Sequence, residues 1–128
     1  MIEIGTFLKC KNLKNIELPE GLEKIDFMAF RESGLQNVVF PKSLRTVSQE
    51  AFSYCENLKE ATLNSGLEVL GTENKTEFAG VFGGSALERV ELPSTLKRIC
   101  NCAFASCKSL RYISLPNSLE SIGALCFF

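Results

Sequence analysis

The chain contains no histidine among its 128 residues. Without histidine it lacks the commonest general base, and both Ser-His and Cys-His nucleophile pairs are excluded. The glycines at 80, 83 and 84 do not have the spacing of a dinucleotide-binding or P-loop motif. No residue set that would hold a cofactor is present either, so we expect a protein without catalytic activity.

An excess of charge and a long apolar run are also missing. The 14 basic residues are scattered among 15 acidic ones, for a net charge of -1, so no electrostatic case exists for a nucleic-acid partner. No apolar stretch approaches the roughly 18 to 20 residues of a membrane span, and we expect no membrane insertion. The first residues also lack the apolar segment of a secretory signal.

Proline is scarce, and its positions are informative. Pro19, Pro41, Pro93 and Pro116 each follow a strand-like run and precede a leucine by three residues. One short unit is therefore copied along the sequence. A period of roughly 20 to 30 residues indicates a solenoid, in which stacked units share a core that no unit can form alone.

A phenylalanine column sets the register of the repeat, with spacings of 23, 22, 30, 22 and 23 residues. Its members are Phe7, Phe30, Phe52, Phe82, Phe104 and Phe127. The chain is thus one array over residues 1–128, with complete units at 7–29, 30–51, 52–81, 82–103 and 104–126. Six further columns agree: an early leucine, a β-branched position, a second apolar residue, a late leucine, a late isoleucine and a small residue before the next phenylalanine.

The spacing within a unit predicts its local structure. Leu-x-x-Ile-x-Leu, as in residues 110–115, has the alternation of a strand with one face inward. The proline follows this run because it has no N–H to donate to a ladder. The later Leu-x-x-Ile pair is too short for a helix and fits either a second short strand or a 3-10 turn. We expect a right-handed coil with a parallel β-sheet on one wall and strand-like or 3-10 segments on the other, mainly β and irregular.

The combined pattern resembles the BspA-like leucine-rich repeat, a surface-antigen type with units near 23 residues. Residues 107–110 and 115–119 match it closely, as do residues 92–96 and the Ala103-Phe104 pair. The resemblance implies a leucine-rich repeat solenoid that binds proteins, in the manner of cell-surface or secreted adhesins. It implies no fixed binding residues, because the motif side chains point inward.

The third unit departs from the pattern in two places. Asn64 occupies the proline position, and about seven extra residues fall between positions 71 and 79. Loops that break a repeat period project from the stack and often carry function. This one contains Asn74-Lys75-Thr76, an acceptor pattern for N-glycosylation in a eukaryotic secretory route.

The six cysteines are interpreted as small buried thiols. Cys10, Cys55 and Cys107 share one column with serines between them, so members two units apart lie near 10 Å, beyond the reach of a disulfide. Cys100 and Cys102 form a cluster with Cys107, but the second half of a zinc motif is missing. We expect no metal site.

Outward positions of the predicted strand wall are the candidate protein-binding residues, since inward positions are used for packing. They are Asn15, Asn37, Glu60, Arg89 and Tyr112 in one column and Glu17, Val39, Thr62, Glu91 and Ser114 in the next. Adjacent rows place Glu60 beside Arg89 and Arg89 beside Tyr112. Tyrosine and arginine are enriched at binding hot spots, so Arg89 with Tyr112 is the preferred anchor.

The repeat motif continues to both ends of the sequence without polar capping units. The last coil, with Leu115, Leu119 and Ile122, is expected to leave an apolar face uncovered. This predicts part of a longer array or self-association through the ends. The function hypotheses are therefore an adhesin-type binding module, an intracellular interaction scaffold, or a structural spacer.

Overall fold

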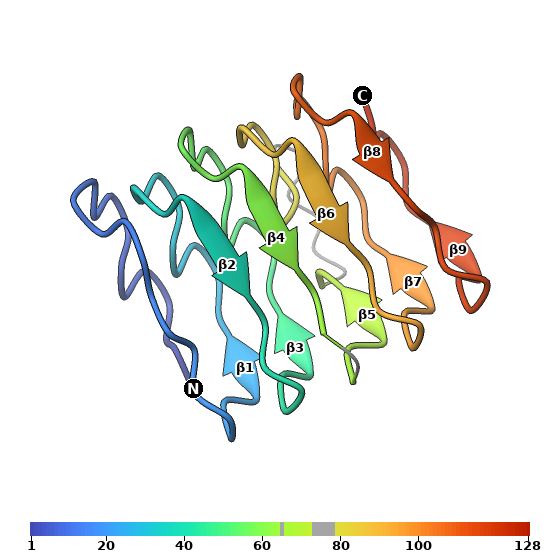
Figure 1. The fold of residues 1–128 in the computed structure, drawn as a ribbon, viewed down its shortest axis with the longest axis horizontal. Helices are drawn as coiled ribbons and strands as arrows, with labels where there is room; N and C mark the ends of the chain where they lie inside the picture. The colour runs from blue at the N-terminus through green and yellow to red at the C-terminus, as the bar shows by residue number, and fades with distance from the viewer. Residues whose placement is uncertain (65, 73–78) are drawn as a thin grey trace.

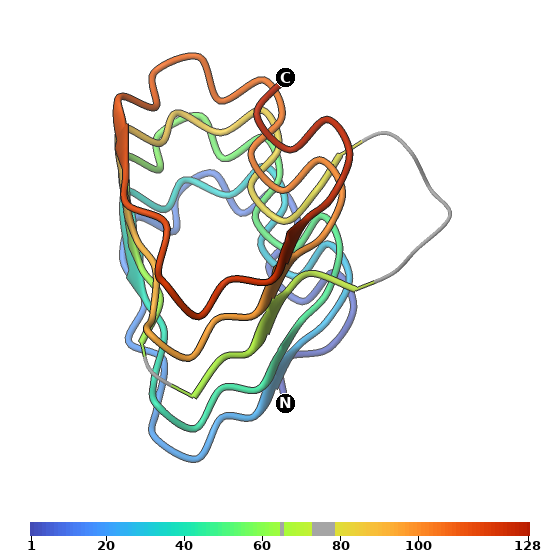
Figure 2. The same cartoon turned by 90° about the vertical axis from the view of Figure 1, so that its right-hand side faces the viewer.

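The computed structural model describes residues 1–64, 66–72 and 79–128, and they wind into a solenoid of stacked coils (Figure 1). Seen along the stack, each coil has three sides: two are built from short strands and one from turns (Figure 2). The described residues form parallel sheets and irregular segments, as the repeat spacing predicted. Among them, no helix is long and apolar enough to cross a membrane.

The first side, here called the strand wall, is a four-stranded parallel sheet in the order β2-β4-β6-β8. Its strands are β2 (Asn37–Val39), β4 (Glu60–Thr62), β6 (Arg89–Glu91) and β8 (Tyr112–Ile113). The central residue of β2, β4 and β6 is buried while its first neighbour is exposed, which confirms the predicted alternation. The first unit is the exception: residues 13–18 carry the strand motif but form no strand.

The second side resolves the two alternatives for the Leu-x-x-Ile pair in favour of a strand. Here the chain forms β1 (Lys24–Ile25), β3 (Thr46–Val47), β5 (Val69–Leu70), β7 (Arg98–Ile99) and β9 (Ser121–Ile122). They pair in parallel as β1-β3 and β5-β7-β9. The first coil is therefore paired on this side through β1, and Ile2, which precedes the first unit, adds a single bridge to Ile25.

The third side, the turn wall, is a ladder of backbone hydrogen bonds around the phenylalanine column. Each phenylalanine N–H donates to the carbonyl that precedes the next phenylalanine, as from Phe30 to Ala51 at 2.8 Å and from Phe52 to Val81 at 2.8 Å. Residues two before or two after a phenylalanine adopt a left-handed backbone, including Met28, Glu50 and Tyr54 at φ 54 to 59°. Such a conformation is uncommon outside glycine. At Tyr54 it accompanies a hydrogen bond from the N–H to the Gly83 carbonyl of the next coil at 2.8 Å.

The phenylalanine side chains stack into one column through the core. Successive ring centroids from Phe7 to Phe127 lie 5.0–5.8 Å apart, with interplanar angles of 6–19°. Phe40, from the strand wall, packs against this column at 5.7 Å from Phe52. Aromatic pairs at this separation add to the stabilisation from area burial. The column therefore joins all coils of the described chain.

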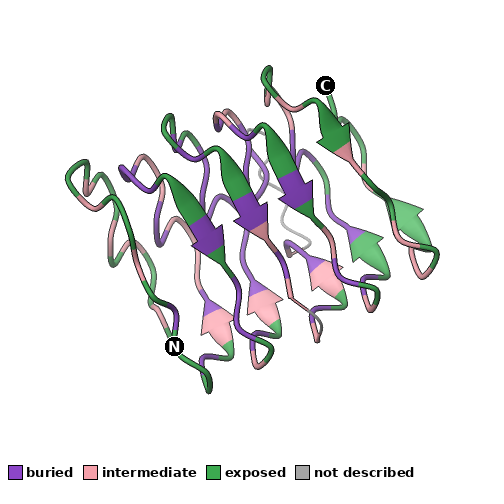
Figure 3. Ribbon diagram, viewed as in Figure 1, coloured by how far each residue is buried: buried purple, intermediate pink, exposed green. Residues whose placement is uncertain are grey.

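The apolar core thins toward the ends of the stack, where the colours change from buried to exposed (Figure 3). In the last coil Leu115 is 45% and Ile122 is 42% exposed, as expected, whereas Leu119 is half-buried. Phe127 stacks on Phe104 at 5.6 Å and is 47% exposed.

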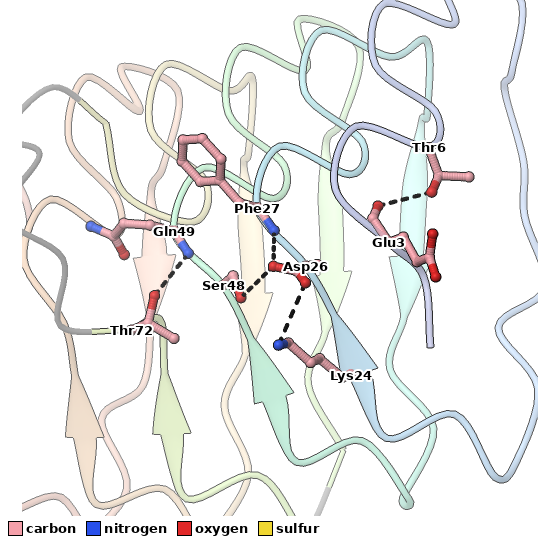
Figure 4. Close-up of polar contacts among 8 residues, drawn as sticks. All are labelled: Glu3, Thr6, Lys24, Asp26, Phe27, Ser48, Gln49 and Thr72. Carbon is pink, nitrogen blue, oxygen red and sulfur yellow. Dashed lines mark hydrogen bonds and ion pairs between the residues drawn. The ribbon is translucent and has the colours of Figure 1, made fainter.

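The predicted insertion lies mostly outside the described residues, and so do Asn74-Lys75-Thr76. Where the chain enters it, the Thr72 hydroxyl accepts a hydrogen bond from the Gln49 N–H at 3.3 Å (Figure 4). The buried Gln49 side chain extends past this coil to donate from Nε2 to the Asn101 carbonyl at 3.1 Å. Its Oε1 has no hydrogen-bond partner among the described residues. Gln49 thus links the coils on either side of the insertion.

Asp26, the sole aspartate of the chain, caps the turn after β1 (Figure 4). Its carboxylate accepts from the Phe27 N–H at 2.7 Å and lies 3.4 Å from Lys24 Nζ and 3.5 Å from the Ser48 hydroxyl. The Phe27 N–H is the main reason why the pKa of Asp26 is lowered from 3.8, with Lys24 and Ser48 adding to the effect against desolvation.

A lowered folded-state pKa makes this carboxylate a pH-dependent stabiliser. Ionised Asp26 stabilises the fold above its unfolded pKa, and that contribution is lost as the pH falls through the lower folded pKa. We expect Asp26→Asn to reduce the free energy of unfolding by about 1 kcal/mol at pH 7, with a smaller difference near pH 3. Urea unfolding at both pH values measures this, with exposed Glu23→Gln as the control. An equal cost of Asp26→Asn at both pH values would contradict the assignment.

Candidate functional site

The candidate binding residues lie in adjacent rows of the strand wall. The register pairs Asn37 with Glu60, Glu60 with Arg89, and Arg89 with Tyr112. The next outward column pairs Val39 with Thr62 and Thr62 with Glu91, and exposed Ser114 follows β8. The neighbours predicted for Arg89 are therefore confirmed. Whether these residues bind a partner stays a prediction.

Side chains at the two ends of the strand wall differ in character. At one end Tyr112 is 72% exposed and lies next to exposed Arg89. At the other end Val39 is 55% exposed, and the polar residues beside it are carboxylates and amides. Exposed Asn15 and Glu17 belong to this second end, but they sit on the first coil, which forms no strand.

A groove of about 500 Å³ lies between the first coil and β2. The polar or exposed residues that line it are Asn15, Glu17, Glu20, Asn37, Val39 and Asn64. Four of them were predicted from the outward columns, whereas Glu20 and Asn64 were not. Asn64 could have been found, because it is the one departure from the proline column.

Two hydrogen bonds fix the far end of this groove. The Asn64 side chain donates from Nδ2 to the Phe40 carbonyl at 2.6 Å, a bond that proline at this position could not make. The Lys42 N–H donates to Glu20 Oε1 at 3.3 Å. Asn64 therefore ties the third coil to the second at the point where the strand wall ends.

The groove exists because the first coil does not pair with the strand wall. In the inner rows the Phe40 N–H donates to Thr62 at 2.8 Å, and the Leu63 N–H donates to Glu91 at 2.9 Å. The equivalent bond from Leu18 to the Val39 carbonyl is not formed. Across residues 1–64, all of which the structure describes, no backbone hydrogen bond joins residues 15–18 to β2.

A second cluster, on the turn wall, was missed from the sequence. Arg31 forms an ion pair with buried Glu50, and its guanidinium carbon lies 4.9 Å from the centroid of the Tyr54 ring. The ring lies against Gly84, where a Cβ would come within 2.6 Å of it. In the sequence, a glycine at position 84 occupies the same column of the repeat as Tyr54, which could have indicated a large side chain packed against it. Only the structure shows that the Tyr54 ring packs on Gly84 of the next coil.

Three of the six cysteine thiols, those of Cys55, Cys107 and Cys126, have a raised pKa. All six are free, and Cys55 donates from its thiol to the Phe30 carbonyl at 3.1 Å while Cys107 donates to Phe82 at 3.2 Å. Burial raises the pKa of the Cys55 and Cys107 thiols, and it raises that of Cys126 to about 11. These thiols are protonated near neutral pH. In the described part of the chain no three His, Cys, Asp or Glu residues form a group that could hold a metal ion.

Comparison with known proteins identifies the class. Residues 1–74 and 78–128 match the family model described as the BspA type leucine-rich repeat region, in six copies. The chain belongs to this leucine-rich repeat family, as its motifs indicated.

A solved structure supports the same fold. A leucine-rich repeat protein from Bacteroides ovatus is similar over 92% of this chain, with 33% sequence identity and a TM-score of 0.79. This chain spans 29% of the length of that protein. Among curated proteins, none matches the chain.

Proposed function

We propose that the strand wall is a non-catalytic protein-binding surface, used in the manner of an adhesin-type surface protein. The observation that carries this is the pairing of 72% exposed Tyr112 with Arg89 on the neighbouring strand. A large aromatic side chain and a guanidinium on adjacent strands form a rigid anchor, because the sheet sets their separation. Leucine-rich repeat proteins are typically non-enzymatic, which agrees with the protonated thiols and the lack of histidine.

The test is binding to purified extracellular-matrix proteins by the chain and its variants. We expect Arg89→Ala combined with Tyr112→Ala to weaken binding by about 2 kcal/mol, or about thirtyfold in Kd, as for a hot-spot pair. Lys97→Ala, on the second side of the coil, is the control, because its exposed pair with Glu68 contributes little. Binding that is equally strong in the double variant would place the interface elsewhere.

Two other roles predict different outcomes. An intracellular scaffold would bind a cytosolic protein through the same wall and ignore matrix proteins, whereas a structural spacer would bind neither. Retained binding of a cytosolic partner that depends on Arg89 and Tyr112 would favour the scaffold.

Self-association is a second candidate function, favoured by the apolar end of the stack. Leu125 is 59%, Phe127 is 47% and Phe128 is 82% exposed there. Exposed apolar patches of this kind mark contacts between proteins. We expect the chain to form oligomers by light scattering, and Leu125→Glu with Phe128→Glu to give monomers. The matched control is Tyr112→Glu on the strand wall, and monomers of the unaltered chain at high concentration would exclude this function.

A further inference from the structure

The groove between the first coil and β2 differs chemically from the rest of the strand wall. Of the residues that line it, all within the described part of the chain, two are carboxylates and three are amides, and none is lysine or arginine. The carboxylates are Glu17 and Glu20. By contrast, the anchor at the opposite end contains Arg89.

Neither carboxylate forms an ion pair with a residue in the described part of the chain. The four ion pairs found there join other residues: Lys9 with Glu32, Lys24 with Asp26, Arg31 with Glu50, and Lys97 with Glu68. Glu17 is exposed, and Glu20 accepts a backbone N–H from Lys42 through one oxygen only. The negative charge of the groove is therefore available to pair with a cationic group of another molecule.

The edge of the sheet adds unpaired acceptors to this charge. In the inner rows the carbonyls of Thr62 and Glu91 face the preceding coil and accept a hydrogen bond from it. By the same register the Val39 carbonyl faces the first coil, where it has no backbone donor. The side chain of Val39 is 55% exposed beside it. The groove thus combines carboxylates, amide groups, an unpaired carbonyl and an apolar surface.

We propose that this groove receives an arginine side chain from an extended segment of the protein partner. Guanidinium carries five N–H donors in a planar fork, which suits a carboxylate and neighbouring carbonyl oxygens at once. Its flat faces and its aliphatic stem pack on an apolar side chain such as Val39. The volume of about 500 Å³ accommodates such a side chain together with its flanking backbone. The inference rests on the proposed function and names the chemistry of the partner.

The test uses the full chain labelled with ¹⁵N and a capped hexapeptide that carries one central arginine. The same peptide with citrulline, which has the shape of arginine but no charge, is the ligand control. We expect the arginine peptide to shift the backbone signals of Asn37 and Val39 and the side-chain amide signals of Asn15 and Asn64. The citrulline peptide should leave them in place.

Protein variants locate the site. Glu17→Gln and Glu20→Gln together should weaken the arginine peptide at least fivefold, and the dispersion of the spectrum shows that each variant is folded. Glu88→Gln removes an exposed carboxylate just before β6, outside the groove and outside the candidate binding columns, and it should leave binding unchanged. If glutamine in place of Glu20 disturbs the Lys42 turn, Glu17→Gln alone should still weaken binding.

Three outcomes would overturn the proposal: equal shifts from the arginine and citrulline peptides, an effect of Glu88→Gln as large as that of Glu17→Gln, or shifts spread over all acidic surfaces. The result is separable from the test of the proposed function. Loss of matrix-protein binding in the Arg89 and Tyr112 variant does not affect the peptide, since these residues lie outside the groove.

Discussion

The column of stacked phenylalanine rings is the interaction on which the other parts of the structure depend. A single coil has two strands of two or three residues and cannot form a core alone. Ring spacings of 5.0–5.8 Å set the separation of the coils and place strand beside strand on both strand-bearing sides. The left-handed residues around each ring orient its N–H toward the next coil. The candidate binding surface is therefore positioned by residues that no partner touches.

The third unit departs from the repeat at two places, and at both the coils remain stacked. The insertion falls between positions 71 and 79, and Gln49 joins the flanking coils by a bond to Asn101. The rings of Phe52 and Phe82, on either side of it in the sequence, still stack at 5.4 Å. Asn64 replaces a proline and gains a hydrogen bond to the preceding coil. Both departures compensate with polar contacts between coils.

Much of the fold could be predicted from the sequence, because each column of the repeat keeps the residue type that its position in the coil requires, such as an apolar side chain where the chain faces the core. Alternation at Val38, Ala61 and Val90 predicted inward strand positions, and the common period predicted the row order of Glu60, Arg89 and Tyr112. The Leu-x-x-Ile pair is compatible with either a strand or a turn, because two apolar residues are too few to show a periodicity.

Other features depend on contacts that a sequence pattern does not record. Tyr54 adopts a left-handed backbone and donates its N–H to the Gly83 carbonyl of the next coil, although its residue type does not favour this conformation. The first unit has the same motif as the rest, yet residues 15–18 form no backbone hydrogen bond with β2, and the groove lies between them. The position of Glu20 in the groove could therefore be found only from the structure. The protein-binding roles of the outward residues remain predictions.

The most direct measurement of the central claim is the stability of Phe52→Ala compared with Phe128→Ala. Phe52 is fully buried and contacts three rings, whereas Phe128 is 82% exposed. Chemical unfolding should show a loss of about 3 to 5 kcal/mol for Phe52→Ala, in one transition for the whole array, and almost none for Phe128→Ala. If Phe52→Ala costs less than about 1 kcal/mol, or unfolds only its own unit, the column does not hold the coils together.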